Sequence, residues 1–181
     1  MRILLILICV LSCFSCSINQ NIYYDYKLFS INQKFNLDYI PISIQLPGRW
    51  VFDKQNKATL FFKNKITGRH FVFNGGEKTK YEFYSDSLTN DSLYLEAYYK
   101  WDSDYLLKQL RGTKSVIIER GLSNGKYQYL IWKLEGKEGY FMYLTGIKEI
   151  YAFNIMHNIG GELTISKKHI LEFFEHITIN R

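Results

Sequence analysis

The chain has 181 residues, a formal net charge of +6 at pH 7, 47% apolar residues and 17% aromatic residues. This apolar content excludes an intrinsically disordered chain, and the length suits one domain with a tether. The basic residues are scattered among acids and are densest at Lys63, Lys65 and Arg69. The charge is therefore typical of a mixed solvated surface, and we expect no nucleic-acid partner.

The first residues have the order of a secretory signal. Arg2 supplies a positive charge, Ile3–Leu11 is an unbroken apolar run, and the small residues Ser12 and Ser15 each precede a cysteine. The apolar run has about half of the ~20 residues that a helix needs to span a bilayer. A cleaved export signal is therefore favoured over a permanent transmembrane helix.

The segment Leu11–Ser17 resembles the lipobox of bacterial lipoproteins, in which apolar and small residues precede an obligatory cysteine. In that family the cysteine is diacylated and becomes the first residue after cleavage. Cys16 lies in a sequence, Phe-Ser-Cys-Ser, much like that of Bacteroidetes lipoproteins, whereas Cys13 has the better apolar residue three places upstream. We favour lipidation of Cys16 and keep Cys13 as the alternative. An ordinary cleaved signal is the third interpretation.

The resemblance implies a signal peptide over residues 1–15 and attachment to membrane lipid through the acylated cysteine. Ser17 stands where many lipoproteins retained at the inner membrane have Asp, so we expect an outer-membrane protein that faces the periplasm. All three cysteines of the chain lie within its first 16 residues. The mature domain would therefore have no disulfide, thiol nucleophile or cysteine-bound metal.

The remaining residues divide into a tether, 16–37, and one domain, 38–181. The tether is polar with scattered aromatic residues and can end in a short strand. In the domain, alternating apolar residues over 40–46 predict a strand. Pro41 has no amide hydrogen, so this strand should lie at a sheet edge or start late. Three further strands are expected at residues 50–53, 58–63 and 69–74, before a closing Gly75-Gly76.

Residues 85–112 are predicted to be helical in two pieces, the first over 91–100 and the second ending at Gly112. The caps that start the two pieces are Thr89 or Asn90 for the first and Asp102 or Ser103 for the second. The first piece has an apolar stripe with a spacing of four residues, formed by Leu93, Ala97 and Trp101.

A meander of four strands is expected next, at residues 114–120, 126–135, 140–145 and 149–157. Asn124-Gly125 is a strong signal for a hairpin, and Gly146 marks a further turn. A closing helix over 167–176 follows a cap at Ser166. Because strands are grouped apart from helices, this order predicts an α+β fold, with one antiparallel sheet and helices packed on it.

Three stretches resemble the PsbP-like fold, which is shared with the MOG-type Ran-binding proteins and with many small bacterial lipoproteins. They are residues 42–50 (ISIQLPGRW), the strand, turn and strand of 116–134, and the closing helix 170–177 (ILEFFEHI). The resemblance covers residues 38–180. It implies a binding and assembly module rather than an enzyme, and it carries over no site residue, because no functional motif matches.

The sequence has no serine-hydrolase elbow, phosphate-binding loop or dinucleotide-binding motif, so we expect no enzyme activity and no cofactor. His157 with Glu162 could form an acid-base pair, which makes a hydrolase the least favoured hypothesis. His169 and His176 lie two turns apart on the closing helix without a third ligand, so no metal site is expected. Asp102–Asp104 fits helix capping better than calcium binding.

Aromatic side chains crowd the region of the first predicted helix, at Tyr94, Tyr98, Tyr99, Trp101 and Tyr105. Five aromatic residues overfill one buried helix face, and Tyr and Trp are enriched in protein interfaces. We therefore expect these residues to form the contact surface of a lipid-anchored interaction module that binds an unknown envelope protein. The alternative is a small-ligand or lipid carrier with an apolar cavity between sheet and helices.

Overall fold

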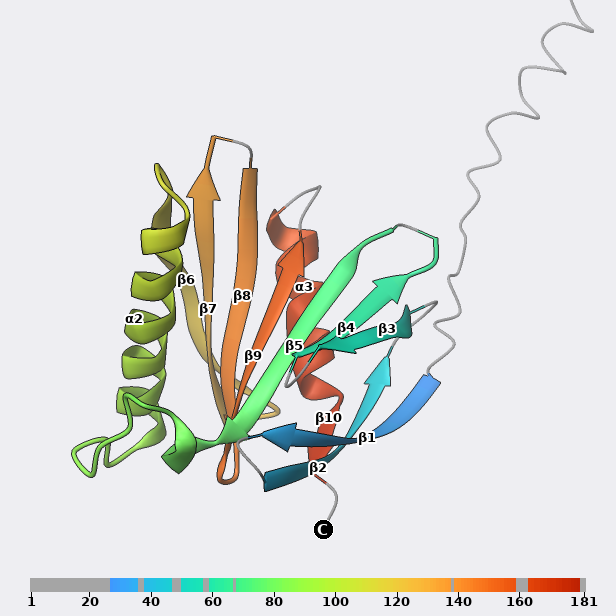
Figure 1. Cartoon of the computed structure of the whole chain (residues 1–181), viewed down its shortest axis with the longest axis horizontal. Coiled ribbons are helices and arrows are strands. Elements are labelled where there is room, and N and C mark those ends of the chain that lie inside the picture. Colours follow the sequence, from blue (N-terminus) through green and yellow to red (C-terminus); the bar gives the residue numbers. More distant parts are fainter. Residues whose placement is uncertain are drawn as a thin grey trace, which may run out of the picture.

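A seven-stranded antiparallel sheet forms the centre of the fold (Figure 1). The computed structural model describes residues 27–35, 38–46, 50–56, 59–66, 68–137, 139–158 and 163–179. The strands of the central sheet have the order β3-β4-β5-β9-β8-β7-β6. In chain order they are β3 (Trp50–Asn56), β4 (Thr59–Asn64), β5 (His70–Glu77), β6 (Lys114–Ser123), β7 (Tyr127–Gly136), β8 (Gly139–Lys148) and β9 (Tyr151–Asn158).

A smaller sheet and two long helices complete the described fold. The smaller sheet has the order β1-β2-β10, with β1 (Lys27–Phe35), β2 (Asp38–Leu46) and β10 (Ile177–Ile179). The helices are α2 (Asp91–Gln109) and α3 (Leu163–Glu175), and a short 3-10 turn spans Lys78–Lys80. Helix α2 packs on β6, β7 and β8, whereas α3 packs on β8, β9 and β2 on the opposite face (Figure 1). The predicted α+β class is confirmed.

Each face of the central sheet is covered, because neighbouring side chains of a strand point to opposite faces. In β7, Leu130 and Trp132 pack in the layer of α2, while Ile131 packs in the layer of α3. The α2 layer also contains Tyr81, Tyr94, Leu95, Tyr98, Leu134, Tyr143, Ile147 and Ala152. The α3 layer contains a group of phenylalanines, namely Phe62, Phe71, Phe73, Phe153, Phe173 and Phe174. No helix in the described ranges is long and apolar enough to cross a membrane.

The first predicted strand is correct in position but not in its place in the sheet. Strand β2 lies between β1 and β10, so it is central rather than an edge strand. Pro41 is tolerated there because β10 is short and pairs only with Ile42–Ile44, while Pro41 itself lies opposite Asn32 of β1. Strand β1 also shows that the fold starts upstream of residue 38, within the predicted tether.

The predicted Asn-Gly hairpin is confirmed. Asn124 and Gly125 both have positive φ, 52° and 65°, and the Lys126 amide donates to the Ser123 carbonyl at 3.1 Å. Two successive residues with positive φ define the turn type whose twist matches that of the flanking strands. This turn fixes the register of β6 against β7.

Two glycine positions that were predicted as turns lie inside strands instead. Gly75 lies within β5 and Gly146 within β8. A Cβ atom at Gly75 would lie 2.6 Å from the Phe153 ring, and one at Gly146 would lie 2.5 Å from the Phe174 ring. These glycines therefore make room for aromatic rings of the α3 layer, and the turn after β8 occurs at Glu149, whose φ is 57°.

Helix α2 is continuous, so the predicted break near Asp102 is wrong. Asn90 caps its start, accepting the Leu93 amide on Oδ1 at 3.0 Å, which agrees with one of the two predicted caps. At the expected break, Ser103 Oγ donates to the Lys100 carbonyl at 3.3 Å, a bond within the helix that leaves its path uninterrupted. The predicted apolar stripe is also wrong, because Leu93 is 47% exposed.

Helix α3 begins earlier than predicted. It starts at Leu163, so Ser166 lies inside the helix, where it is buried, rather than at its cap. After the helix, Lys148 of β8 donates to the carbonyls of Glu175 and Ile177, at 3.2 and 2.6 Å. Its ammonium group also lies over the Phe174 ring, 4.8 Å from the centroid. Lys148 therefore satisfies carbonyl groups where α3 passes into β10.

Candidate functional site

The five aromatic residues predicted to bind a partner do not form one surface. Tyr94 and Tyr98 are 2% and 3% exposed, Tyr99 and Trp101 are half-buried, and Tyr105 is 58% exposed. The side chains of Tyr94 and Tyr98 therefore cannot contact a partner of the folded domain, and that part of the prediction is wrong. A contact role for Tyr105 and for the outer parts of Tyr99 and Trp101 stays a prediction.

Most of these helix side chains are buried because aromatic residues of the sheet and of the segment after β5 pack against them. Trp132 and Tyr143 stack in parallel with their ring centroids 4.1 Å apart, and the Tyr99 ring meets Trp132 edge-on at 5.4 Å. Tyr98 packs against Tyr81, with centroids 5.1 Å apart. Such ring contacts fill the space between α2 and the sheet, so most of the helix aromatics are core residues.

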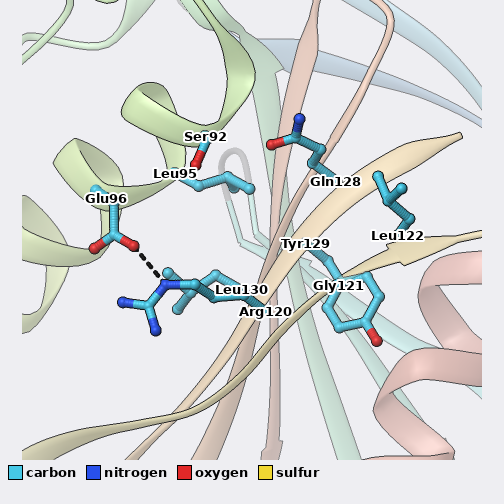
Figure 2. A pocket seen from close by; sticks show the side chains of 9 residues that line it. All are labelled: Ser92, Leu95, Glu96, Arg120, Gly121, Leu122, Gln128, Tyr129 and Leu130. Carbon is cyan, nitrogen blue, oxygen red and sulfur yellow. Dashed lines mark hydrogen bonds and ion pairs between the residues drawn. The ribbon is translucent and has the colours of Figure 1, made fainter.

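A groove on the surface opens between the first half of α2 and the strands β6 and β7 (Figure 2). Its volume is about 270 Å³. It is lined by Ser92, Leu95 and Glu96 of α2, Arg120, Gly121 and Leu122 of β6, and Gln128, Tyr129 and Leu130 of β7. Leu95 and Leu130 are buried and give the groove an apolar floor, whereas Leu122 is 57% exposed at its margin.

The charged groups of the groove are paired with each other. Arg120 Nε donates to Glu96 Oε1 at 2.6 Å, which links β6 to α2 across the groove (Figure 2). The pKa of Arg120 is raised, mainly by this hydrogen bond to Glu96. Both side chains are about half exposed, so the pair contributes little to stability. The groove therefore offers apolar contacts next to an ion pair whose two charges balance each other.

Strand β6 forms one outer edge of the central sheet, and its regular part lies beside the groove. In the described residues, β6 pairs only with β7. Its register shifts between Ile117 and Glu119, so Ile118 and Glu119 both face the α3 layer. Beyond this bulge, Glu119–Ser123 continues as a regular strand whose outer edge is without a second partner strand among these residues.

Two contacts hold this part of β6 in place from the α3 side. Glu119 accepts hydrogen bonds from Lys167 Nζ and from the Tyr129 hydroxyl, each at 2.6 Å. The Lys167 bond, with that from Tyr129, lowers the pKa of Glu119. The Tyr129 ring lies over Gly121, where a Cβ atom would be 2.5 Å from the hydroxyl oxygen. The edge next to the groove is therefore rigidly positioned.

A partly buried polar pair joins the middle of α2 to the sheet. Asn154 Nδ2 of β9 donates to Asp102 Oδ2 at 2.6 Å, while Asn154 Oδ1 has no hydrogen-bond partner among the described residues. Burial raises the pKa of Asp102 to about 6, and the Asn154 bond opposes this shift. Asp102 is thus held by the sheet and does not act as the helix cap that was predicted.

His157 was predicted as one half of an acid-base pair. Its side chain is fully buried beside Trp50 and Phe71, with the Phe71 ring centroid 4.6 Å away, and neither ring nitrogen has a partner in the described part of the chain. Burial, with the nearby His169 and Arg69, lowers the pKa of His157 to about 3. The proposed partner Glu162 lies outside the described residues, as do Cys13 and Cys16.

The other two candidate ligands lie apart. His169 Nδ1 is 3.5 Å from Arg69 Nη1, and His176 Nδ1 is 2.6 Å from the Glu172 carbonyl oxygen. In the described ranges, no cluster of three His, Cys, Asp or Glu side chains could hold a metal ion. His169 therefore lies at the middle of α3 against the β4–β5 hairpin, whereas His176 contacts the last turn of the helix.

The groove was not among the predicted sites. Its signal in the sequence is slight: Leu122 is an apolar residue that directly precedes the Ser-Asn-Gly turn. Its exposure depends on β6 being the last strand of the sheet, which periodicity alone does not reveal.

No family model and no curated protein matches this chain. Among solved structures, it is similar to a protein from Bacteroides thetaiotaomicron VPI-5482, determined as a crystal structure at 1.50 Å resolution. The TM-score is 0.41 and the sequence identity 13%, over 77% of this chain and 45% of that one. The chain therefore spans less than half the length of that protein.

Proposed function

We propose that this chain is a lipoprotein of the bacterial cell envelope that acts as a non-enzymatic interaction module. In this proposal an acylated Cys16, or alternatively Cys13, attaches it to the outer membrane on the periplasmic side. The support is the short apolar run that ends at these cysteines and the lack of any cysteine after residue 16. We also propose that residues 38–180 are PsbP-like, in keeping with the antiparallel sheet and its two helices.

The observation that carries the interaction role is the outer edge of β6 beside an apolar groove. Glu119–Ser123 presents backbone donors and acceptors that an added strand can pair with. Alternate side chains of such a strand would point toward α2, where Leu95, Leu122 and Leu130 provide apolar contacts. We therefore propose that the partner is an envelope protein that contributes an extended segment with an apolar side chain for this groove.

The packing of the interior favours this role over that of a carrier. Buried aromatic and aliphatic side chains pack together in both layers between the sheet and its helices. A groove of about 270 Å³ that opens at the surface is smaller than the ~300–1,000 Å³ typical of small-molecule sites. His157 and Asp102, whose pKa values are shifted to about 3 and about 6, lie outside the groove, His157 beside the Phe71 ring and Asp102 in a hydrogen bond with Asn154.

The experiment has two arms, and the first tests the anchor. The full chain is expressed in a bacterial host that is fed a palmitate analogue. The parent and Cys13→Ser should be labelled, Cys16→Ser should lose the label, and the double variant should leave the membrane fraction. An unlabelled parent contradicts the anchor, and loss of the label in Cys13→Ser alone moves the acylation to Cys13.

The second arm tests the groove. A photoreactive residue at Leu122 should crosslink to one envelope protein, whereas the same residue at Leu110, which is 38% exposed at the end of α2, should not. Leu122→Asp should weaken binding of that partner about tenfold, because it places a charge at the margin of the apolar groove. Equal crosslinking from both positions, or unchanged binding by Leu122→Asp, contradicts the groove as the contact site.

A further inference from the structure

The turn between β4 and β5 exposes an apolar side chain among basic ones. Ile66 is 65% exposed, more than any other large apolar side chain in the described residues. Lys63 and Lys65 beside it are also exposed, and Arg69 follows across the turn. The sequence has no acidic residue from Lys54 to Gly76. We call Lys63, Lys65, Ile66 and Arg69 the basic hairpin tip.

Backbone hydrogen bonds fix the shape of this tip. The Asn64 amide donates to the Arg69 carbonyl and the Gly68 amide donates to the Asn64 carbonyl, each at 2.9 Å. The Asn64 side chain accepts the Ile66 amide at 2.9 Å, an Asx turn that leaves the Ile66 side chain outside the hairpin. Gly68 has a φ of 68°, which a glycine adopts without strain. Ile66 is thus exposed by a defined structure.

The start of α3 extends the same surface. Arg69 Nη1 lies 3.5 Å from His169 Nδ1, which brings the hairpin against α3. Ile165, one helical turn before His169, is 43% exposed, and Leu163 is 38% exposed. In Figure 1 the β4–β5 turn and the first turn of α3 both lie in the upper part of the molecule. Exposed apolar side chains and basic groups therefore share this end.

We infer that the basic hairpin tip docks on an anionic lipid surface, with Ile66 inserted among the headgroups and Lys63, Lys65 and Arg69 near lipid phosphates. Charge complementarity favours this partner, because the tip has three cationic side chains and no acid. An apolar side chain at the apex suits a membrane interface, where it leaves water while lysines reach the phosphates. The setting rests on the proposed lipid anchor, which would hold the domain next to such a surface.

The fold provides a matched control at another turn. Ile150 lies in the turn between β8 and β9 and is 56% exposed, nearly as much as Ile66. Its neighbour in the turn is the exposed acid Glu149, and Lys148 on the other side is buried. Figure 1 shows this turn at the lower end of the molecule, away from the β4–β5 turn. If exposure of an apolar side chain were enough for lipid binding, Ile66 and Ile150 should bind lipid equally well.

The test uses quenching of tryptophan fluorescence by brominated phospholipids. The full-chain variants I66W and I150W are reconstituted with brominated phosphatidylcholine vesicles, with and without phosphatidylglycerol. Trp50 and Trp132 are buried and Trp101 is half-buried, so the parent chain serves as the reference. The added fluorescence of I66W should be quenched in vesicles that contain phosphatidylglycerol, and that of I150W in neither kind.

Adding K63Q/K65Q to I66W should lower the ratio of docked to undocked hairpin by about 25-fold, roughly fivefold for each lysine. The inference is overturned if I66W and I150W are quenched equally. It is also overturned if quenching of I66W is the same with and without phosphatidylglycerol and with and without the two lysines. Failure of this inference can be distinguished from failure of the proposed lipid anchor. If the chain carries no palmitate label, the unlabelled protein is added to preformed vesicles, and quenching of I66W is compared with that of I150W in the same way.

Discussion

His157 is a titratable side chain enclosed by apolar rings. Both of its nitrogens lack a partner in the described part of the chain, and an unsatisfied buried polar group costs about 1–3 kcal/mol. The ring is close in shape to phenylalanine, and its neighbours Trp50 and Phe71 are aromatic. We therefore expect His157→Phe to raise the free energy of unfolding at pH 7 by about 1 kcal/mol, measured by urea denaturation.

The same variant should change the response to acid. The folded pKa of about 3 lies below the ordinary value of 6.5, so the unfolded chain binds a proton first as the pH falls. The free energy of unfolding that depends on neutral His157 is therefore fully present above pH 6.5 and is lost as the pH falls through about 3. His157→Phe should not show this loss between pH 6.5 and 3. Asp102 titrates in both proteins, so the difference between them isolates His157. Lower stability of His157→Phe at pH 7 would show that the imidazole has a stabilising partner.

Aromatic residues show where residue-level prediction succeeds and where it stops. The crowding of tyrosines on α2 correctly indicates that some are exposed, as Tyr105 is. Which of them are buried depends on Trp132 of β7 and Tyr143 of β8, whose rings stack beneath the helix. The groove residues Arg120 and Leu122 escape prediction for the same reason, because their surroundings come from α2 and β7.

At the scale of elements, β8 requires a glycine where α3 crosses it. The Phe174 ring occupies the space of a Cβ atom at Gly146, so Gly146→Ala forces the ring or the helix to move. Overpacking of this kind costs about 1–3 kcal/mol, and we expect a loss of about 2 kcal/mol in thermal or urea unfolding.

A second substitution provides the control for this prediction. Phe174→Leu should be destabilising by itself but should recover part of the loss when combined with Gly146→Ala, because the smaller side chain makes room for the methyl group. Strictly additive effects of the two substitutions would contradict a clash between these residues.

Prediction of the elements depends on local signals. Alternation of apolar residues and the Asn124-Gly125 turn locate β2 and the β6–β7 hairpin, because these signals act over a few residues. Gly75 and Gly146 carry the same letter as a turn glycine, yet they serve close packing against rings that lie far away in sequence. Asp102 likewise pairs with Asn154 of β9 instead of capping a helix, and the helix sequence does not contain that partner.

For the whole molecule, the central sheet joins two cores into one folding unit. Strands β7, β8 and β9 contribute side chains to both the α2 layer and the α3 layer, so neither layer can be lost while the other keeps its sheet. We expect both layers to unfold in one transition. The double variant W101F/W132F keeps only Trp50, whose fluorescence reports unfolding of the α3 layer. The double variant W50F/W101F keeps only Trp132, whose fluorescence reports unfolding of the α2 layer. In each variant the fluorescence midpoint should coincide with that from circular dichroism, and separate midpoints would show independent cores.

The pairing of β10 with β2 has a consequence for when the protein can fold. Ile177–Ile179 lies opposite Ile42–Ile44, so a strand made early waits for one made more than a hundred residues later. Residues 177–179 must therefore leave the ribosome before the small sheet can close, and loop closure over such a separation is slow. Closure of the small sheet should therefore be a late step of folding.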